Sequence, residues 1–239
     1  MKEVLIDRKW LRLEEVEAIL NSQARLKLDD GTKHEIQKCR DFLDRKVGNS
    51  DDLIYGVNTG FGSLCNTAIS KEDLSTLQSN LVRSHACGMG ELVPVEIVKR
   101  MLLLKIMGLS HGKSGVQVET VERLIYFYNN EIYPVVYQQG SLGASGDLAP
   151  LAHLCLPLLG EGEVVYKGIR RPTSEVYLEL NLKPISLQSK EGLALLNGTQ
   201  FMSSFASYAI EHAFKLWRQF NLIGAMSLEA YDGRINPFQ

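Results

Sequence analysis

The tripeptide Ala144-Ser145-Gly146 has residue types that can build an electrophile from their own backbone. The amide nitrogen of Gly146 can attack the carbonyl carbon of Ala144, two residues back, and so close a five-membered ring. Loss of water from this ring and from the Ser145 side chain leaves a methylene group conjugated to a carbonyl and an imine. Glycine permits the close backbone approach that the attack requires. The product is an electrophile that no ordinary side chain supplies.

Other interpretations of the glycine-rich segments are weaker or fail on their residues. A plain glycine turn before a helix stays open, because three common residues are a weak signal. The earlier loop, residues 51–67, contains Gly60-Phe61-Gly62 but lacks the third glycine of a dinucleotide fingerprint. Neither loop ends in the Gly-Lys-Ser/Thr of a phosphate loop. In Gly143–Asp147, an aspartate stands where a hydrolase nucleophile elbow needs its last glycine.

The elements that must hold these loops are mostly helices. Apolar residues recur at helical spacing through much of the chain, and capping residues precede several of these stretches. Pro94 is well placed to open a helix that is apolar nearly all round and therefore buried. The predicted helices are residues 13–20, residues 36–47 after a capping box at Thr32–Glu35, residues 74–85 after Ser70, residues 94–108, residues 118–128 after a cap at Ser114 and Gln117, a helix capped by Asp147, and residues 201–220.

One β-hairpin is predicted at residues 163–171, with Lys167-Gly168 as its turn. The resulting fold class is mainly α, with two glycine-rich loops and a small β-hairpin. We expect residues 1–239 to form a single mainly helical domain. Because loops on a rigid scaffold often carry function, we expect the chemistry at the glycine-rich loops.

Composition excludes several classes of function. The 239 residues carry 26 basic and 28 acidic side chains, a net charge of −2, which argues against nucleic acid as a partner. The longest apolar stretches are too short to span a bilayer, and the first eight residues are too charged for a signal peptide. The four cysteines lack paired or zinc-ligand spacing, which is typical of free thiols in the cytoplasm. We predict no metal site.

Four blocks of sequence resemble the aromatic amino acid ammonia-lyases. They occur in the order and at the spacing of that family, and the resemblance covers nearly the whole chain, most closely with the histidine-specific members. The blocks are Tyr55–Gly62 (YGVNTGFG), Asn80–His85 (NLVRSH), Gly143–Leu154 (GASGDLAPLAHL) and Glu191–Gln200 (EGLALLNGTQ).

The resemblance implies a helical fold of the aspartase-like superfamily and a prosthetic group, 4-methylidene-imidazol-5-one (MIO), made autocatalytically from residues 144–146. It implies that Tyr55 is the catalytic tyrosine and that Asn197 holds the prosthetic group and the carboxylate end of the substrate. His85 lies where the family contacts the substrate ring. The implied reaction converts L-histidine to urocanate and ammonia in the cytoplasm.

General chemistry agrees with these roles. The proton that must leave histidine is on a barely acidic carbon, so the elimination needs an electrophile and a positioned base. Tyr55 can be that base only where its phenolate is stabilised. Structural alternatives stay open: Tyr55 as a core tyrosine, His85 as a buried histidine on a leucine stripe, and His153 as a packing or hydrogen-bonding residue.

The length departs from the family pattern. Family members are about twice as long and form homotetramers whose active sites combine several subunits, so this sequence resembles an N-terminal half with the C-terminal half absent. Three hypotheses follow: a histidine ammonia-lyase, a tyrosine or phenylalanine ammonia-lyase or aminomutase, and a catalytically silent fragment that only oligomerises. The apolar helix 95–107 and the final long helix favour self-association.

Overall fold

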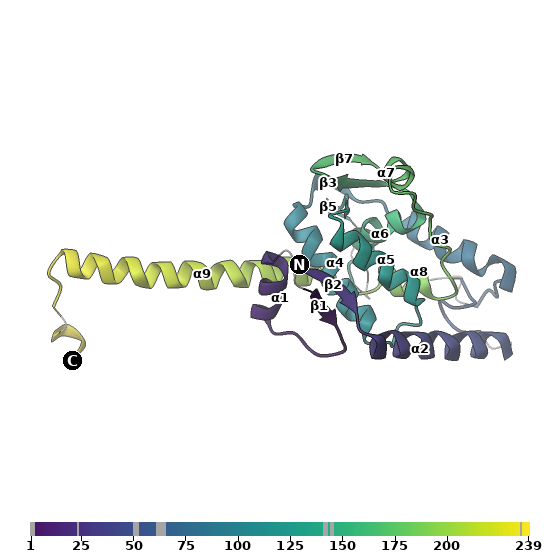
Figure 1. Cartoon of the computed structure of the whole chain (residues 1–239), viewed down its shortest axis with the longest axis horizontal. Coiled ribbons are helices and arrows are strands. Elements are labelled where there is room, and N and C mark those ends of the chain that lie inside the picture. The colour runs from purple at the N-terminus through teal and green to yellow at the C-terminus, as the bar shows by residue number, and fades with distance from the viewer. Residues whose placement is uncertain are drawn as a thin grey trace.

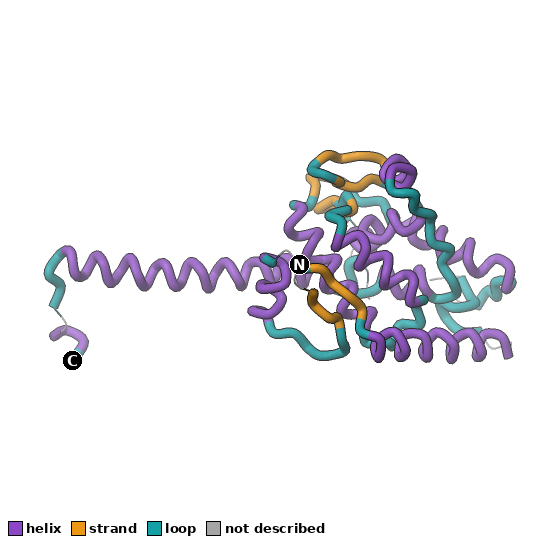
Figure 2. Tube along the Cα trace, viewed as in Figure 1, coloured by secondary structure: helices purple, strands orange, loops and turns teal. Residues whose placement is uncertain are grey.

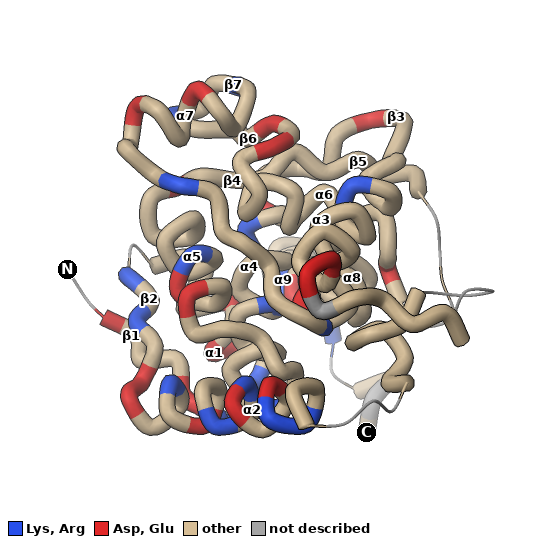
Figure 3. The backbone as a smooth tube through the Cα atoms, turned by 90° about the vertical axis from the view of Figure 1, so that its right-hand side faces the viewer, with Lys and Arg blue, Asp and Glu red and all other residues tan. Residues whose placement is uncertain are grey.

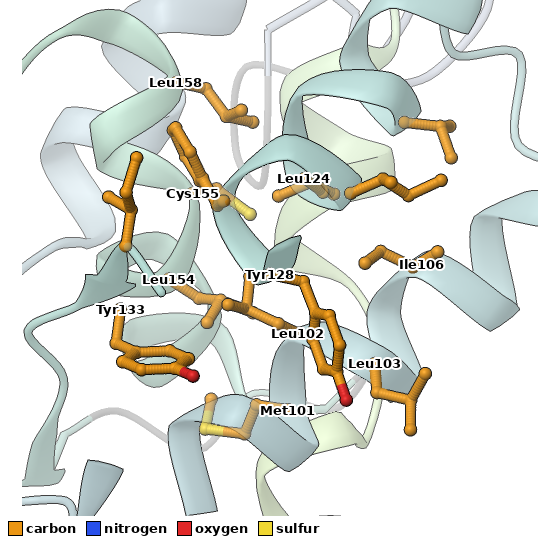
Figure 4. Packing of buried hydrophobic residues seen from close by; sticks show 14 of the residues in the cluster. Met101, Leu102, Leu103, Ile106, Leu124, Tyr128, Tyr133, Leu154, Cys155 and Leu158 are labelled. Atoms are coloured by element: carbon orange, nitrogen blue, oxygen red, sulfur yellow. The ribbon is translucent and has the colours of Figure 1, made fainter. Parts of the chain in front are cut away.

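Two buried helices, α4 (Val95–Ser110) and α5 (Val118–Asn129), form the centre of the fold. The computed structural model describes residues 3–22, 24–49, 53–60, 66–140, 143, 146–234 and 236–239. Apolar side chains of α4 face those of α5 and of the helix that ends at Cys155 (Figure 4). The helix predicted from Pro94 is confirmed, because Pro94 is its N-cap and most of its residues are buried. Helices dominate the chain (Figure 2), as the sequence predicts.

The N-terminal part adds two helices and a pair of short strands. Helix α1 (Leu13–Asn21) and helix α2 (Asp30–Asn49) flank the parallel pair of β1 (Glu3–Ile6) and β2 (Arg25–Leu28), which the sequence did not predict. The prediction of a capping box at Thr32–Glu35 is wrong. Helix α2 begins earlier, and the Asp29 carboxylate accepts the hydrogen bond from the Thr32 amide at 3.0 Å. Aspartate caps a helix as well as threonine does, so the cap moves three residues upstream.

The predicted hairpin is confirmed at one side of the body. Strands β6 (Glu163–Tyr166) and β7 (Ile169–Pro172) pair antiparallel, and both Lys167 and Gly168 have positive φ, as a two-residue hairpin turn requires. Strand β3 (Met89–Leu92) pairs with β5 (Tyr137–Gln139), and β4 (Tyr133–Pro134) pairs with β6. The other short elements are helix α7 (Thr173–Glu179) and the 3-10 helices η2 (Lys71–Asp73), η3 (Leu156–Leu159) and η4 (Asn236–Phe238).

Three short helices pack against one another beside α4. They are α3 (Leu74–His85), α6 (Leu148–Cys155) and α8 (Glu191–Leu196), and Figure 3 shows them grouped on one side of the body. Leu81, Ala152 and Leu196, one from each helix, form a separate buried apolar cluster. Basic and acidic residues are mixed over the surface in the same view. We call these three helices the platform.

A long helix, α9 (Gln200–Ala230), extends away from the body (Figure 1). Its first half packs on α4, where Arg100 and Glu211 form a buried ion pair of 2.7 Å. Beyond this pair, large apolar side chains are exposed, including Trp217 at 62% and Phe220 at 74%. Among the described residues, the helices are all too short or too polar to cross a membrane.

Candidate active site at the ends of the platform helices

The platform brings three of the four sequence blocks to one place. His85 is the last residue of α3, Gly146 lies two residues before α6, and Asn197 follows directly after α8. Because Leu81, Ala152 and Leu196 pack together, the three helices are held in fixed relative positions. The candidate site is therefore built on helix ends that are supported by a common apolar cluster.

Gly146 and Gly198 form a close backbone seam. They are joined by a bridge of the parallel type, and the Asp147 amide donates a hydrogen bond of 2.9 Å to the Gly198 carbonyl oxygen. Gly146 has φ +125°, a conformation that L side chains rarely adopt. The segment that carries Asn197 therefore lies directly against the third residue of the tripeptide.

The described residues on either side of Ala144 and Ser145 are hydrogen-bonded to each other. Gly143 and Gly146 exchange two backbone hydrogen bonds, of 3.1 and 3.2 Å. Ala144 and Ser145 themselves lie outside the described residues. The described flanks are compatible with the predicted ring, because these two hydrogen bonds hold residues 143 and 146 together and because position 146 has no room for a Cβ atom.

Asp147 is the N-cap residue of α6, as the sequence predicts, and its carbonyl oxygen accepts the Leu151 amide at 3.1 Å. Its side chain makes no cap hydrogen bond to α6, whose third position is Pro150 and lacks an amide hydrogen. The carboxylate, in a residue only 5% exposed, instead accepts the Met202 amide at 3.0 Å in the first turn of α9. Asp147 thus links the predicted ring to the long helix.

Asn197 is oriented by its own helix. Its side-chain Nδ2 donates to the Leu193 carbonyl oxygen at 2.8 Å, and its amide nitrogen donates to the same oxygen at 3.0 Å. With Nδ2 engaged in this way, Oδ1 is the acceptor that the side chain offers to a ligand. Oδ1 therefore suits a hydrogen-bond donor, whereas the carboxylate group expected here from the resemblance would need the second hydrogen of Nδ2.

His85 presents one ring nitrogen from the end of α3. Its Nδ1 lies 2.9 Å from the Leu81 carbonyl oxygen and 3.1 Å from Ser84 Oγ. A carbonyl oxygen only accepts, so Nδ1 carries the hydrogen in this contact and Nε2 is the acceptor in the neutral ring. The side chain is half-buried, which differs from a histidine fully enclosed in the core.

Tyr55 lies in the described part of the first glycine-rich segment and is 52% exposed. The buried side chain of Gln78 connects this segment to the platform: its Nε2 donates to the Gly56 carbonyl oxygen at 3.4 Å, and its Oε1 accepts the Leu193 amide at 3.3 Å. Gly62, within the same sequence block, lies outside the described residues. Tyr55 as a fully buried core tyrosine is therefore wrong.

The sequence interpretation missed three buried polar residues behind the site. They are Gln78, Lys105 and Glu191, each within otherwise apolar helix faces, and that interruption is the signal that marks them. Glu191 accepts hydrogen bonds from the amides of Gln117 and Gln188, from Gln117 Nε2 and from Thr120 Oγ1. The Gln117 side chain therefore binds Glu191 and does not cap α5.

His153 is a hydrogen-bonding residue, as one of the sequence alternatives proposed. Its Nε2 accepts the Gly88 amide at 2.9 Å, and its ring packs edge-on against Tyr137 with centroids 5.1 Å apart. Burial lowers the pKa of His153 below its usual value. The contact fixes the segment that follows His85.

Within the described ranges, His, Cys, Asp and Glu side chains form no group that could hold a metal ion. The described cysteines, Cys39, Cys87 and Cys155, are free thiols. The described part of the site therefore offers hydrogen-bonding groups and a glycine-rich turn.

Comparison with known proteins identifies the family to which the chain is similar. Residues 11–239 match the sequence pattern of the family described as aromatic amino acid lyase. The histidine ammonia-lyase of Deinococcus radiodurans is 47% identical over 236 residues, a match that covers 99% of this chain and 45% of that protein. The chain thus spans about 45% of the length of this curated relative.

Two solved structures have the same fold. The crystal structure of histidine ammonia-lyase from Trypanosoma cruzi matches with a TM-score of 0.88 at 35% identity, covering 98% of this chain and 45% of that one. Tyrosine aminomutase from Streptomyces globisporus matches with a TM-score of 0.91 at 33% identity, covering 99% and 44%. The chain therefore belongs to the aromatic amino acid lyase family.

Proposed function

We propose that this chain carries the electrophile-forming part of an ammonia-lyase that converts L-histidine to urocanate and ammonia. The seam between Gly146 and Gly198 is the observation that supports the proposal, because Gly198 follows Asn197 and Gly146 is the third residue of the predicted ring-forming tripeptide. The similarity to the Deinococcus radiodurans histidine ammonia-lyase supports histidine as the substrate. The chain spans less than half of that relative, so the full reaction is a proposal for the whole protein.

The electrophile would be 4-methylidene-imidazol-5-one, formed from Ala144, Ser145 and Gly146. The Gly146 amide nitrogen bonds to the Ala144 carbonyl carbon, and the former carbonyl oxygen leaves as water with the amide hydrogens of Gly146 and Ser145, so that a double bond forms between that carbon and the Ser145 nitrogen. A second water takes the Ser145 hydroxyl and the hydrogen on its Cα, which leaves a carbon–carbon double bond. No external oxidant or reductant is needed. The group supplies an electron sink to the bound amino acid.

The residues around the tripeptide have distinct roles in this proposal. Asn197 Oδ1 accepts a hydrogen bond from the substrate ammonium group, and the second hydrogen of Nδ2 can be donated to the substrate carboxylate or to the carbonyl oxygen of the ring. His85 Nε2 accepts a hydrogen bond from the imidazole N–H of the substrate, since its Nδ1 hydrogen is directed at Leu81. Tyr55 is the base that removes the proton once its phenolate is stabilised.

A second substrate is favoured by one comparison. The fold match to tyrosine aminomutase is as close as the match to histidine ammonia-lyase. A tyrosine phenol also donates a hydrogen bond, so His85 Nε2 suits either substrate, whereas a phenylalanine ring offers it no donor. Turnover of histidine compared with that of tyrosine separates these two functions.

The exposed apolar part of α9 supports assembly into a homo-oligomer, a tetramer in the whole protein. A chain that assembled but never released ammonia would instead be the catalytically silent fragment considered from the sequence. The free thiols among the described cysteines support a cytoplasmic location.

Intact mass tests the proposal directly. A closed ring lowers the mass of the purified chain by two waters, and the Ser145→Ala variant lacks the hydroxyl and cannot form the methylene group. We expect the deficit in the unmodified chain and not in the variant. The same deficit in both proteins would show that the ring assignment is wrong. Release of ammonia and of a near-ultraviolet-absorbing acrylate from histidine, in the whole protein, tests the substrate.

A further inference from the structure

A buried lysine holds the end of α8 from the opposite side of the platform. Lys105, on α4, is only 2% exposed, and its Nζ donates to the carbonyl oxygens of Ala194 at 2.9 Å and of Asn197 at 3.1 Å. The last carbonyl groups of a helix have no partners within that helix. A cation at this end also interacts favourably with the helix dipole. Lys105 thus satisfies acceptors that α8 cannot satisfy itself.

This contact is costly, which argues that it does more than fill space. Burial lowers the pKa of Lys105 to about 8 and raises the pKa of the Cys155 thiol on α6 to about 11, and the two groups interact electrostatically. An apolar side chain of similar volume would avoid that desolvation cost. A neutral amine still has two N–H groups, one for each carbonyl oxygen, so the contact does not depend on the charge.

The Asn197 carbonyl group, which Lys105 binds, is one residue away from Gly198 and its contact with Gly146. Lys105 binds the Asn197 carbonyl oxygen, and the next carbonyl oxygen, that of Gly198, accepts the Asp147 amide and adjoins Gly146. A shift of the Asn197 carbonyl therefore moves Gly198 relative to Gly146. Misplacement by about 1 Å is enough to slow a reaction that depends on backbone approach by about a hundredfold.

We propose that Lys105 is a positioning residue that sets the Asn197–Gly198 backbone against Gly146 and so controls the rate of ring closure. The inference rests on the ring chemistry proposed above. Among the described residues, the hydrogen bonds of Lys105 are to the carbonyl oxygens of Ala194 and Asn197 and not to Gly146. Its effect is transmitted through two backbone carbonyl groups.

The test compares Lys105→Met with Lys99→Met in the full chain. Lys99 is a matched control, because it lies on the same helix, is half-buried, and donates to a single distant carbonyl oxygen, that of Leu20, at 2.8 Å. The first measurement is hydrogen exchange at the Asp147 amide, which reports the bond to Gly198. The second is the rate at which the mass deficit of two waters develops.

We expect Lys105→Met to speed exchange at Asp147 and to slow ring closure, each by about tenfold, the value of one or two lost hydrogen bonds. Lys99→Met should change neither relative to the unmodified chain. Unchanged exchange at Asp147 in folded Lys105→Met would overturn the inference, even in a chain whose ring stays open. An absent mass deficit in the unmodified chain, by contrast, counts against the proposed function only.

Lys105→Gln keeps the inference testable where Lys105→Met does not fold. The glutamine side chain is one bond shorter and reaches one of the two carbonyl oxygens at most. We expect faster exchange at Asp147 than in the unmodified chain, by about threefold, with ring closure slowed to match. The positioning role would be refuted if Lys105→Gln showed the same rates of hydrogen exchange at Asp147 and of ring closure as Lys99→Met.

Discussion

A Cβ atom added to Gly146 would lie 1.9 Å from the carbonyl oxygen of Gly198, so the two residues meet where no side chain fits. The atom in the way is a backbone oxygen that the Asp147 amide also binds, and it cannot move aside cheaply. The closeness of this contact fixes the position of the predicted ring relative to Asn197.

Gly146→Ala should therefore destabilise the chain by about 3 kcal/mol, from overpacking together with the unfavourable φ. We also expect the mass deficit of two waters to disappear. Denaturant unfolding and intact mass measure the two effects. Gly168→Ala is the control, because Gly168 also has positive φ but would place its Cβ in open space. Equal losses of stability in the two variants would mean that the contact with Gly198 is not what excludes alanine.

Asp147→Ala should weaken the start of α9 by about 1 kcal/mol, the usual value of a lost helix cap. Asp147→Asn should retain most of the stability, since an amide oxygen can still accept the Met202 amide. Hydrogen exchange at Met202 measures the effect residue by residue. Slow exchange at Met202 in Asp147→Ala would contradict the observed role of this carboxylate.

His153 should make the stability of the chain depend on pH in the weakly acid range. Burial lowers its pKa, so the neutral ring is favoured in the folded state, and its contribution is present above the unfolded value of about 6.5. As the pH falls through the folded pKa, this contribution is lost, because protonated Nε2 can no longer accept the Gly88 amide.

Between pH 7 and pH 5, the free energy of unfolding should thus fall less in His153→Gln than in the unmodified chain. His34→Gln, at an exposed histidine on α2, serves as the control and should follow the unmodified chain. Identical pH profiles for all three proteins would rule out His153 as the origin of the dependence.

The ion pair between Arg100 and Glu211 should be strongly stabilising when tested by removal of one partner. Arg100→Met leaves a buried carboxylate without this cation and should cost about 3 kcal/mol. Burial alone would raise the pKa of Glu211, but hydrogen bonds from Lys215 and Arg100 lower it overall. The Glu211 carboxylate therefore stabilises the folded state above its unfolded pKa of about 4.5, and this stabilisation is lost as the pH falls through its lower pKa in the folded state.

Urea unfolding at pH 7 and below pH 4.5 measures both effects. Glu179→Gln is the control, because its pairs with Lys167 and Arg171 lie at the surface, where ion pairs contribute little. A loss in Arg100→Met no larger than in Glu179→Gln would contradict the prediction.

The outer part of α9 should drive self-association. Trp217→Glu combined with Phe220→Glu places charge on its exposed apolar surface and should shift the chain towards monomer in sedimentation experiments. The control is the double variant Gln219→Glu with Asn221→Glu, which adds the same charge to the same helix without removing apolar surface. A chain that is monomeric at every concentration before any substitution would contradict the prediction.

The sequence predicted local features of the fold well and distant pairings poorly. The hairpin at Lys167-Gly168 follows from adjacent residues, because its turn and both strands lie within ten positions. The pairing of β1 with β2 depends on strands of four residues that are separated by a helix, and such short parallel strands leave no local signal. The cap of α2 was misplaced because both Asp29 and Thr32 are good caps, and only the structure shows which one binds.

The residues of the candidate site also divide into those that the sequence indicated and those that it did not. Residue types showed only what chemistry the tripeptide could do, and the resemblance indicated the tripeptide together with Tyr55, His85 and Asn197. The supporting contacts of Gln78, Lys105 and Glu191 could not be predicted, since each binds backbone or side-chain groups that lie far away in the sequence. A polar residue on an apolar helix face shows that a partner is needed but not where the partner is.

The attachment of α9 to Asp147 has a mechanical consequence. The helix has 31 residues, and at about 1.5 Å per residue it is a stiff rod of about 46 Å. Its inner end is bound by the residue that immediately follows the predicted ring. We expect a torque applied by a neighbour at the outer end to reach Gly146 by two routes, the Asp147–Met202 hydrogen bond and Gly198, which lies two residues before the helix, so that quaternary contacts tune the chemistry from a distance.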